Sequence, residues 1–449
     1  MRKWIAALLL LAVLGSTAAA ETNKGTPLQE CHKVTLTMKD ETRPNGSIVR
    51  LWQAKTALEK VDDAVNGLAK DFAESIAPTL PKGKGKAASS SRVDVEIRYS
   101  RTGLHWLSFL VQARTSYHRK LTGQQLAART YNMETGEEIR LTDIFAEESE
   151  GWDLLAEAVK NQITAYYEGE EPDSAALEQA VGREGLEKAD FTLHGMSLVL
   201  HYPAERFYPE RHTLLEVTLM YPQIRGYMTQ EAQEETDNVS LYRFAALTFD
   251  DGPTRTNTTL VLQNLMKVGV RGTFFVIGNR IANYQDLVQR EHDEGHAVGS
   301  HNWHHGNVSK TSASTLRAMP KKVNAAMMKA IGQIPRYDRV PYGLYPDMMK
   351  AKVGWSYIQW SLDTYDWRGR STATILSEVK KQAADGDILL MHDIKDKTPA
   401  TALAVAEWLQ DNGFMLLTVD ELFAKDGIEL QPDRTYWRNA GGETGIKHR

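Results

Sequence analysis

The sequence predicts an α/β fold for residues 244–425, preceded by a smaller α+β domain. One observation behind this prediction is that short apolar runs alternate with amphipathic helical patterns along residues 244–425. Another is that the polar clusters in this range fall at or just after the ends of the apolar runs. Such alternation is typical of parallel strands joined by helices, with the functional site at the carboxyl ends of the strands.

The chain begins like an exported protein. Residues 1–20 combine a basic start, an apolar run at 5–14 and small residues before Glu21, which predicts a secretory signal peptide. The apolar run is shorter than the ~20 residues that span a bilayer, so a retained anchor is the second interpretation. No transmembrane segment is expected after the signal, and the expected location is secreted or in the cell envelope. A net charge of -5 gives no indication of a nucleic-acid partner.

Residues 21–91 form the first piece of the front half. An alternating segment at 34–38 predicts a short strand, and apolar residues spaced three and four apart between 58 and 76 predict an amphipathic helix. The Lys, Gly and Ser residues of 82–91 predict a flexible basic loop.

Residues 92–228 form the second piece. Strictly alternating apolar residues at 93–99, further strand patterns and one helical pattern predict an α+β accessory domain. The polar segment 229–243 is interpreted as a linker to the domain at 244–425, and the tail at 426–449 gives no indication of its role.

The apolar run that ends in Asp250 and Asp251 is the first candidate site. Two ionised carboxylates at the end of a buried strand repel each other, so one of them needs a neutralising partner. A metal ion provides this if one Asp binds the metal and the other acts as a general base on water. The alternative is a turn in which these side chains only cap the strand.

A histidine cluster about fifty residues later is the second candidate. His301 and His305 are spaced i, i+4, which on a helical turn places two ligands on one face toward a single ion. His304 competes for the same role, and His292 and His296 lie close in sequence. The alternative is that these are ordinary surface or core histidines.

With these residues in place, the chain from about 244 to 423 resembles the polysaccharide deacetylase family, the NodB-homology domain of carbohydrate esterase family 4. The family's motifs occur in order as T-F-D-D-G-P at 248–253, H-N-W-H-H-G at 301–306, R-V-P-Y-G at 339–343, D-T-Y-D-W at 363–367 and L-M-H at 390–392. Asn302, Gly306 and Val340 depart from the family pattern. The resemblance implies a distorted (β/α) barrel with fewer than eight strands.

The resemblance also implies the roles of the central residues. Asp251, His301 and His305 would bind the metal, Asp250 would be the base, and His392 would donate a proton to the leaving amine. One divalent ion is expected. Zinc is the default from availability, with cobalt, nickel or manganese equally compatible with nitrogen and carboxylate ligands.

Further residues would support this centre. Arg339 would hold Asp250, Asp366 would orient His392, and the backbone N–H of Tyr342 would stabilise the oxyanion. The acetyl pocket would be walled by Pro341, Trp367 and Leu390.

The function expected from the resemblance is metal-dependent N-deacetylation of an N-acetylated glycan, with bacterial peptidoglycan favoured over chitin. A chitooligosaccharide deacetylase and an acetylxylan esterase are the alternatives within the family. Through Y-N-M-E-T-G at 131–136, L-T-D-I-F at 141–145 and the strand pattern L-V-L-H-Y at 198–202, the front domain resembles the domain of unknown function found before some cell-wall deacetylases and in lysozyme-sensing anti-sigma factors. Contact with wall polymer or lysozyme is therefore expected there, and a wall- or lysozyme-binding protein with a secondary catalytic role is the alternative from another class. The choice between N-acetylglucosamine and N-acetylmuramic acid, and the oligomeric state, stay open.

Overall fold

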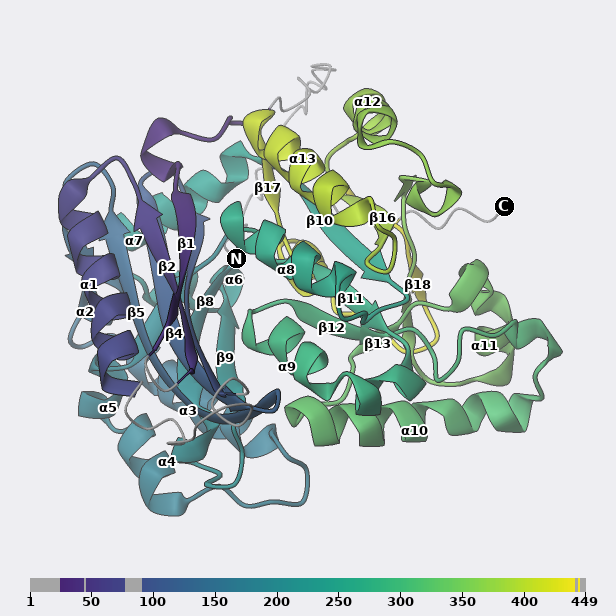
Figure 1. Cartoon of the computed structure of the whole chain (residues 1–449), viewed down its shortest axis with the longest axis horizontal. Coiled ribbons are helices and arrows are strands. Elements are labelled where there is room, and N and C mark those ends of the chain that lie inside the picture. The colour runs from purple at the N-terminus through teal and green to yellow at the C-terminus, as the bar shows by residue number, and fades with distance from the viewer. Residues whose placement is uncertain (1–24, 44–45, 77–90, 441–442, 445–449) are drawn as a thin grey trace, which may run out of the picture.

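The computed structural model describes residues 25–43, 46–76, 91–440 and 443–444. We call residues 25–242 the front region and residues 243–440 the rear region; in Figure 1 the front region lies on the left and the rear region on the right. The predicted signal peptide and most of the predicted basic loop lie outside the described residues. No helix among the described residues is long and apolar enough to cross a membrane.

The front region is built on a six-stranded sheet with strands in sequence order, in which only the β2–β3 pair is parallel. Helix α1 (Glu59–Ile76) packs on one face of this sheet through Val61, Val65 and Ala69. The strands are β1 (Thr35–Thr42), β2 (Ile48–Lys55), β3 (Ser91–Thr102), β4 (Trp106–Tyr117), β5 (Lys120–Asn132) and β6 (Glu138–Ile139). The segment 21–91 therefore shares one sheet with the start of 92–228, because β2 pairs with β3 over residues 48–51.

A second front sheet has three antiparallel strands, β7 (Asp190–Leu193), β8 (Ser197–Pro203) and β9 (Leu214–Met220). Helices that precede or follow it in the chain are α2 (Leu141–Ile144), α3 (Gly151–Ala165), α4 (Ser174–Val181), α5 (Arg183–Glu187) and α6 (Tyr221–Ile224). Strand β7 packs on β4 and β5 of the six-stranded sheet, and β9 contacts helix α9 of the rear region.

The segment 229–243, interpreted from sequence as a linker, is folded. Thr229 caps helix α7 (Gln230–Asp237), and Ala232 is buried in the core. Glu235 is also buried, and its carboxylate accepts the backbone N–H groups of His105 and Trp106. The many Glu and Gln residues of segment 229–243 suggested a solvent-exposed linker. One of them, Glu235, is instead buried and accepts hydrogen bonds from the backbone.

The rear region is the predicted α/β fold. Its strands are all parallel and follow the order β15-β16-β10-β11-β12-β13-β14-β18, with β17 paired to the start of β10. The longer strands are β10 (Arg243–Asp250), β11 (Thr273–Val276), β12 (Ala297–Ser300) and β16 (Asp387–His392). The short ones are β13 (Tyr337–Asp338), β14 (Ser356–Ile358), β15 (Leu362–Asp363), β17 (Phe414–Leu416) and β18 (Thr435–Tyr436).

Helices α8 (Asn257–Lys267), α9 (Gln285–Asp293), α10 (Ala313–Ile331), α11 (Tyr345–Ala351), α12 (Thr372–Gln382), α13 (Thr398–Asp411) and α14 (Val419–Ala424) connect the strands. The described residues thus form a distorted (β/α) barrel with nine strands, so the expectation of fewer than eight was wrong. The number of strands is higher than expected because five of them have only two or three residues, which is too short for a recognisable hydrophobic pattern. One of them, β18, belongs to the tail at 426–449, which closes with the pair β19 (Asn439–Ala440) and β20 (Glu443–Thr444).

The two regions share a hydrophobic core. One cluster of buried side chains joins α3 and the β7–β9 sheet to residues on the rear strands, among them Phe275, Tyr337 and Ile388. The outward face of the six-stranded sheet is polar but also buried, because it packs on the rear region: Arg98 on β3 donates to the Asp293 carbonyl oxygen at 2.6 Å and to Gln112. The rear region thus covers the polar residues that alternate with the apolar ones on β3.

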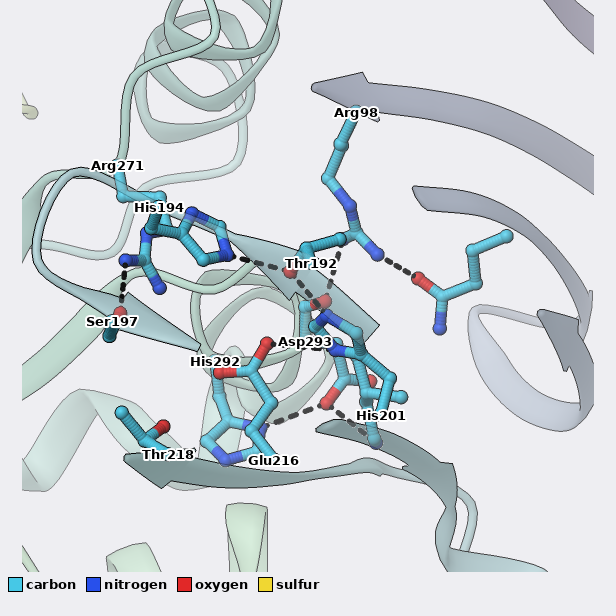
Figure 2. A network of polar contacts seen from close by, with 12 residues as sticks. Arg98, Thr192, His194, Ser197, His201, Glu216, Thr218, Arg271, His292 and Asp293 are labelled. Atoms are coloured by element: carbon cyan, nitrogen blue, oxygen red, sulfur yellow. Dashed lines mark hydrogen bonds and ion pairs between the residues drawn. The ribbon is translucent and has the colours of Figure 1, made fainter. Parts of the chain in front are cut away.

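Figure 2 shows the polar network at this junction. The Thr192 hydroxyl lies 2.8 Å from His194 Nε2 and 2.7 Å from His201 Nε2. Because a hydroxyl has one proton, at least one of these rings must donate to Thr192. Burial holds the pKa of both imidazoles below its ordinary value, to about 3 for His201. These histidines are therefore neutral parts of the junction.

Candidate active site

The predicted site residues come from different strands and meet at one end of the barrel. Asp250 ends β10, His301 follows β12, Arg339 follows β13, and His392 ends β16. Because the strands are parallel, their carboxyl ends lie at the same edge of the sheet, and Asp250 is a register partner of His392.

Asp251, His301 and His305 form a compact group of possible metal ligands. One ligand atom from each lies within 4.8 Å of the others, and within the described part of the chain no other such group is found. Asp251 Oδ1 is 3.4 Å from His301 Nε2 and 3.1 Å from His305 Nε2. This buried oxygen has no hydrogen-bond partner. Although burial opposes it, the two imidazoles hold the pKa of Asp251 at about 2.

The two histidines do not converge through a helical turn, as the i, i+4 spacing had suggested. Residues 301–307 form an irregular loop in which Asn302 adopts a left-handed conformation with φ of 60°. The Asn302 N–H donates to Asp338 Oδ1 at 3.0 Å and to Ser300 Oγ at 3.1 Å. These two acceptors hold the reversal that brings His305 back toward His301.

Hydrogen bonding also selects the tautomer of His301. Its Nδ1–H donates to the Arg339 carbonyl oxygen at 2.5 Å, which leaves Nε2 to face Asp251. Because this hydrogen bond fixes the orientation of the imidazole ring, the lone pair of His301 Nε2 points in one direction, as metal binding requires. His304, the competing histidine, lies instead against Asn279, with its Nδ1 2.8 Å from the amide nitrogen.

Asp250 lies beside this group and is held by Arg339. The guanidinium donates to Asp250 Oδ1 at 2.8 Å and to the Thr248 hydroxyl at 2.7 Å, and it has no exposed surface. Its remaining donors reach the carbonyl oxygens of Ile358 and Gln359. The arrangement fixes one oxygen of Asp250, while Oδ2 lies on the side of His301, 3.9 Å from its Nε2.

His392 is oriented by a second buried carboxylate. Its Nδ1 lies 2.7 Å from Asp366 Oδ1, and Asp366 Oδ2 accepts from the His392 backbone N–H and the Thr398 hydroxyl at 2.7 Å each. Burial alone would lower the pKa of His392, but the carboxylates of Asp366 and Asp250 outweigh it and raise that pKa. This favours the protonated imidazolium form that a proton donor requires.

The predicted pocket residues differ in exposure. Pro341 and Leu390 are buried, whereas Tyr342 and Trp367 are 64% and 45% exposed. The ring of Tyr342 lies 4.7 Å from that of His305, so its side chain borders the metal group.

Several residues next to the site have left-handed backbone conformations. They are Asp251, Asn302, Tyr342 and Tyr365, with φ between 54° and 75°. Each costs about 1 kcal/mol relative to ordinary backbone. Such strain persists only where surrounding contacts impose it, and it cannot be read from residue type.

Two buried acids near the site were missed by sequence reasoning. Asp393 accepts a hydrogen bond from the Thr258 hydroxyl, and a Cβ at Gly252 would lie 2.3 Å from its Oδ2. Burial raises the pKa of Asp393 to about 7 and that of Asp338 to about 6. The only signal for Asp393 was its position directly after His392, and a lone Asp in that place has no distinctive pattern.

The donor set fits a divalent metal ion. Two imidazole nitrogens and one carboxylate oxygen converge, and the unpaired buried Oδ1 of Asp251 lacks the partner that a cation would supply.

Comparison with known proteins places residues 241–355 in the polysaccharide deacetylase family model. The peptidoglycan-N-acetylglucosamine deacetylase PgdA of Listeria monocytogenes is 38% identical over 192 residues, covering 43% of this chain and 41% of that protein. The peptidoglycan-N-acetylmuramic acid deacetylase PdaC of Bacillus subtilis is 34% identical, covering 39% of this chain and 38% of that protein. The chitooligosaccharide deacetylase of a Bradyrhizobium species is 36% identical, covering 35% of this chain and 73% of that protein. The matched part of this chain thus spans about two fifths of the two peptidoglycan deacetylases.

Proposed function

Because the chain belongs to the polysaccharide deacetylase family, we propose that it is a metal-dependent hydrolase that removes the acetyl group from acetamido sugars of a glycan. The observation that carries this proposal is the convergence of three possible metal ligands with a buried carboxylate on one side and a histidine–carboxylate pair on the other. Hydrolysis of an acetamide needs these groups together, because the amide bond is stable and its amine is a poor leaving group.

Asp251, His301 and His305 would hold the metal ion. When bound there, a divalent ion supplies Lewis-acid activation of water and of the acetyl carbonyl. We keep zinc as the expected ion, with cobalt, nickel or manganese as the alternatives, because the ligand types do not choose among them.

The chain's own residues would move the protons. Asp250, held through Oδ1 by Arg339, accepts a proton from the attacking water through its other oxygen. Water adds to the acetyl carbonyl carbon, forming the new C–O bond and a tetrahedral oxyanion. The oxyanion then re-forms the carbonyl as the C–N bond breaks, and the imidazolium of His392 gives its proton to the departing amine. Asp366 keeps the His392 ring in place, and the backbone N–H of Tyr342 would donate to the oxyanion. The products are acetate and a free amino sugar.

Peptidoglycan is the proposed substrate. This rests on the two relatives that are peptidoglycan deacetylases and on the signal peptide predicted for residues 1–20, which would bring the protein to the cell envelope or the medium. Chitooligosaccharides are the second candidate, supported by the Bradyrhizobium relative. Contact of the front region with wall polymer or lysozyme stays a prediction.

The test is acetate release by the full chain from purified peptidoglycan, chitooligosaccharides and acetylated xylan, with a chelator and then added zinc or cobalt. We expect release from peptidoglycan that the chelator abolishes and the metal restores. No release from any of these substrates with any metal would contradict the proposed activity, and release from xylan alone would make the protein an esterase.

A substitution separates metal binding from proton transfer. Asp250→Asn should retain bound metal, measured by atomic absorption, while its kcat falls by roughly 10²- to 10⁴-fold, the usual contribution of a general base. Unchanged turnover in Asp250→Asn would show that another group takes the proton.

A further inference from the structure

A turn beside His392 carries two arginines that the proposed chemistry does not use. Arg368 is the last residue of the short helix Asp366–Arg368, which directly follows Tyr365, and Arg370 lies two residues beyond it. The guanidinium carbon of Arg368 lies 4.6 Å from the ring centroids of both Trp367 and Tyr365. That of Arg370 lies 4.8 Å from the Tyr365 ring. The two cations are thus gathered around one aromatic pair.

The turn is held in a defined shape. Tyr365 and Gly369 are both left-handed, with φ of 54° and 71°, and the Lys397 ammonium donates to the Gly369 carbonyl oxygen at 2.9 Å. Asp366, inside the same turn, holds His392. Arg368 is therefore two residues from a group that orients the proposed proton donor, at the rim of the site and not on a remote surface.

Both guanidinium groups lack an acidic partner. Among the described residues, neither arginine forms an ion pair within 4 Å or a side-chain hydrogen bond, although Arg368 is exposed. The acid closest in sequence to Arg370 on the following helix, Glu378, forms its ion pair with Lys381 and interacts with Arg370 only at longer range. Asp363 accepts from the Tyr365 N–H and is half-buried. Stacking on a ring uses the face of a guanidinium and leaves its in-plane N–H donors available.

We propose that Arg368 and Arg370 form a subsite for a carboxylate on the glycan, next to the sugar that loses its acetyl group. A planar fork of donors matches a carboxylate better than it matches a neutral hydroxyl. In peptidoglycan that carboxylate comes from the lactyl ether of a muramic acid or from the stem peptide, whereas chitin has none. This inference rests on the proposed deacetylase function and narrows its substrate to an acidic N-acetylated glycan.

The test compares substrates that differ in charge. Acetate release by the full chain is measured on intact peptidoglycan, on glycan strands freed of stem peptides, on the same strands with their carboxylates amidated, and on chitooligosaccharides. We expect kcat/KM to be about tenfold higher on a carboxylate-bearing substrate than on the amidated strands, the effect of one charge-assisted hydrogen bond at a rim. Preference for intact peptidoglycan would assign the carboxylate to the stem peptide, and preference for the freed strands would assign it to the lactyl group.

The double variant Arg368→Gln/Arg370→Gln should remove this preference and leave kcat/KM on chitooligosaccharides unchanged. The preference of the unaltered protein should weaken at high ionic strength, because exposed charges are screened. Arg336→Gln is the matched control, since Arg336 is 70% exposed, forms an ion pair with Asp420 and lies on the strand-start side of β13.

Other outcomes would overturn the inference. An equal loss on charged and neutral substrates would mean that the arginines only support the Asp366 turn, and no loss on either would mean that they take no part. If the unaltered protein released no acetate at all, the proposed function would fail. Sedimentation of Asp250→Asn protein with freed and with amidated strands would then still report on the arginines, since binding does not need turnover, and equal binding to both would overturn the subsite.

Discussion

Histidines gather in two places in this protein, at the carboxyl ends of the rear strands and at the junction with the front region. At the strand ends, His301 and His305 direct nitrogen atoms at Asp251 Oδ1, which has no hydrogen-bond partner. At the junction, His194 and His201 bond to the Thr192 hydroxyl (Figure 2).

The difference shows what distinguishes a reactive cluster from a structural one. Both places hold buried polar groups, although His305 itself is exposed. At the junction His194, His201 and His296 each have a hydroxyl or backbone partner: His296, for example, accepts from the Gly272 N–H at 2.9 Å. At the strand ends the lone pairs converge on a point without a protein donor, which leaves room for a cation.

One histidine substitution in each cluster tests this comparison, and the expected difference between the two variants is the largest of these predictions. His301→Gln should lose bound metal, measured by atomic absorption, and should lose deacetylase activity to background, because one ligand of three is removed. His201→Gln should keep both, since the amide of Gln can still bond to Thr192. Loss of metal from His201→Gln with retention in His301→Gln would reverse the assignment of the two clusters.

The substitution Asp366→Asn tests the role of Asp366, the carboxylate that orients His392. We expect kcat to fall by about a hundredfold, because the His392 ring loses its orientation. The Asp366 carboxylate helps raise the pKa of His392 against the effect of burial, and a proton donor must be protonated. The alkaline limb of the pH–rate profile should therefore move to lower pH in the variant. An unshifted limb would assign that limb to another group.

Buried histidines outside the candidate active site predict sensitivity to acid. Burial lowers the pKa of His32, His201 and His296 to about 3, below the value of about 6.5 in the unfolded chain. Between these values the unfolded state binds more protons, so stability is complete above about pH 6.5 and is lost as pH falls toward 3. Each group contributes up to about 1.4 kcal/mol per pH unit. Thermal unfolding at pH 7, 6, 5 and 4 should show this fall, with a shallower slope in His201→Gln.

The smallest expected effect concerns the Thr192 hydroxyl, which His194 and His201 share. Thr192→Val keeps the side-chain shape but leaves two ring nitrogens without a partner, which should cost about 1–3 kcal/mol of unfolding free energy by denaturant titration. Activity at 25 °C should be unchanged, because the junction lies away from the strand ends. A loss of kcat with unchanged stability would mean that the junction is coupled to the site.

Local patterns were enough to predict much of the rear region. Helices α8, α9 and α10 lie in the part of the chain where amphipathic patterns were expected to alternate with strands, because their apolar stripes have the helical period. The motif residues were placed correctly at strand ends, and the expected α/β class is confirmed. The roles of the individual site residues stay predictions until the substitutions above are made.

The sequence by itself determined which residue types are available at each strand end and the family to which the chain belongs. It determined these because strand and helix periods, and motifs of adjacent residues, are local properties of the chain. Only the tertiary structure decided that β3 is covered on both faces, that 230–237 is a packed helix, and that His305 reaches His301 through a left-handed Asn302 held by Asp338. Those features depend on contacts between residues far apart in the chain, and no local pattern records them.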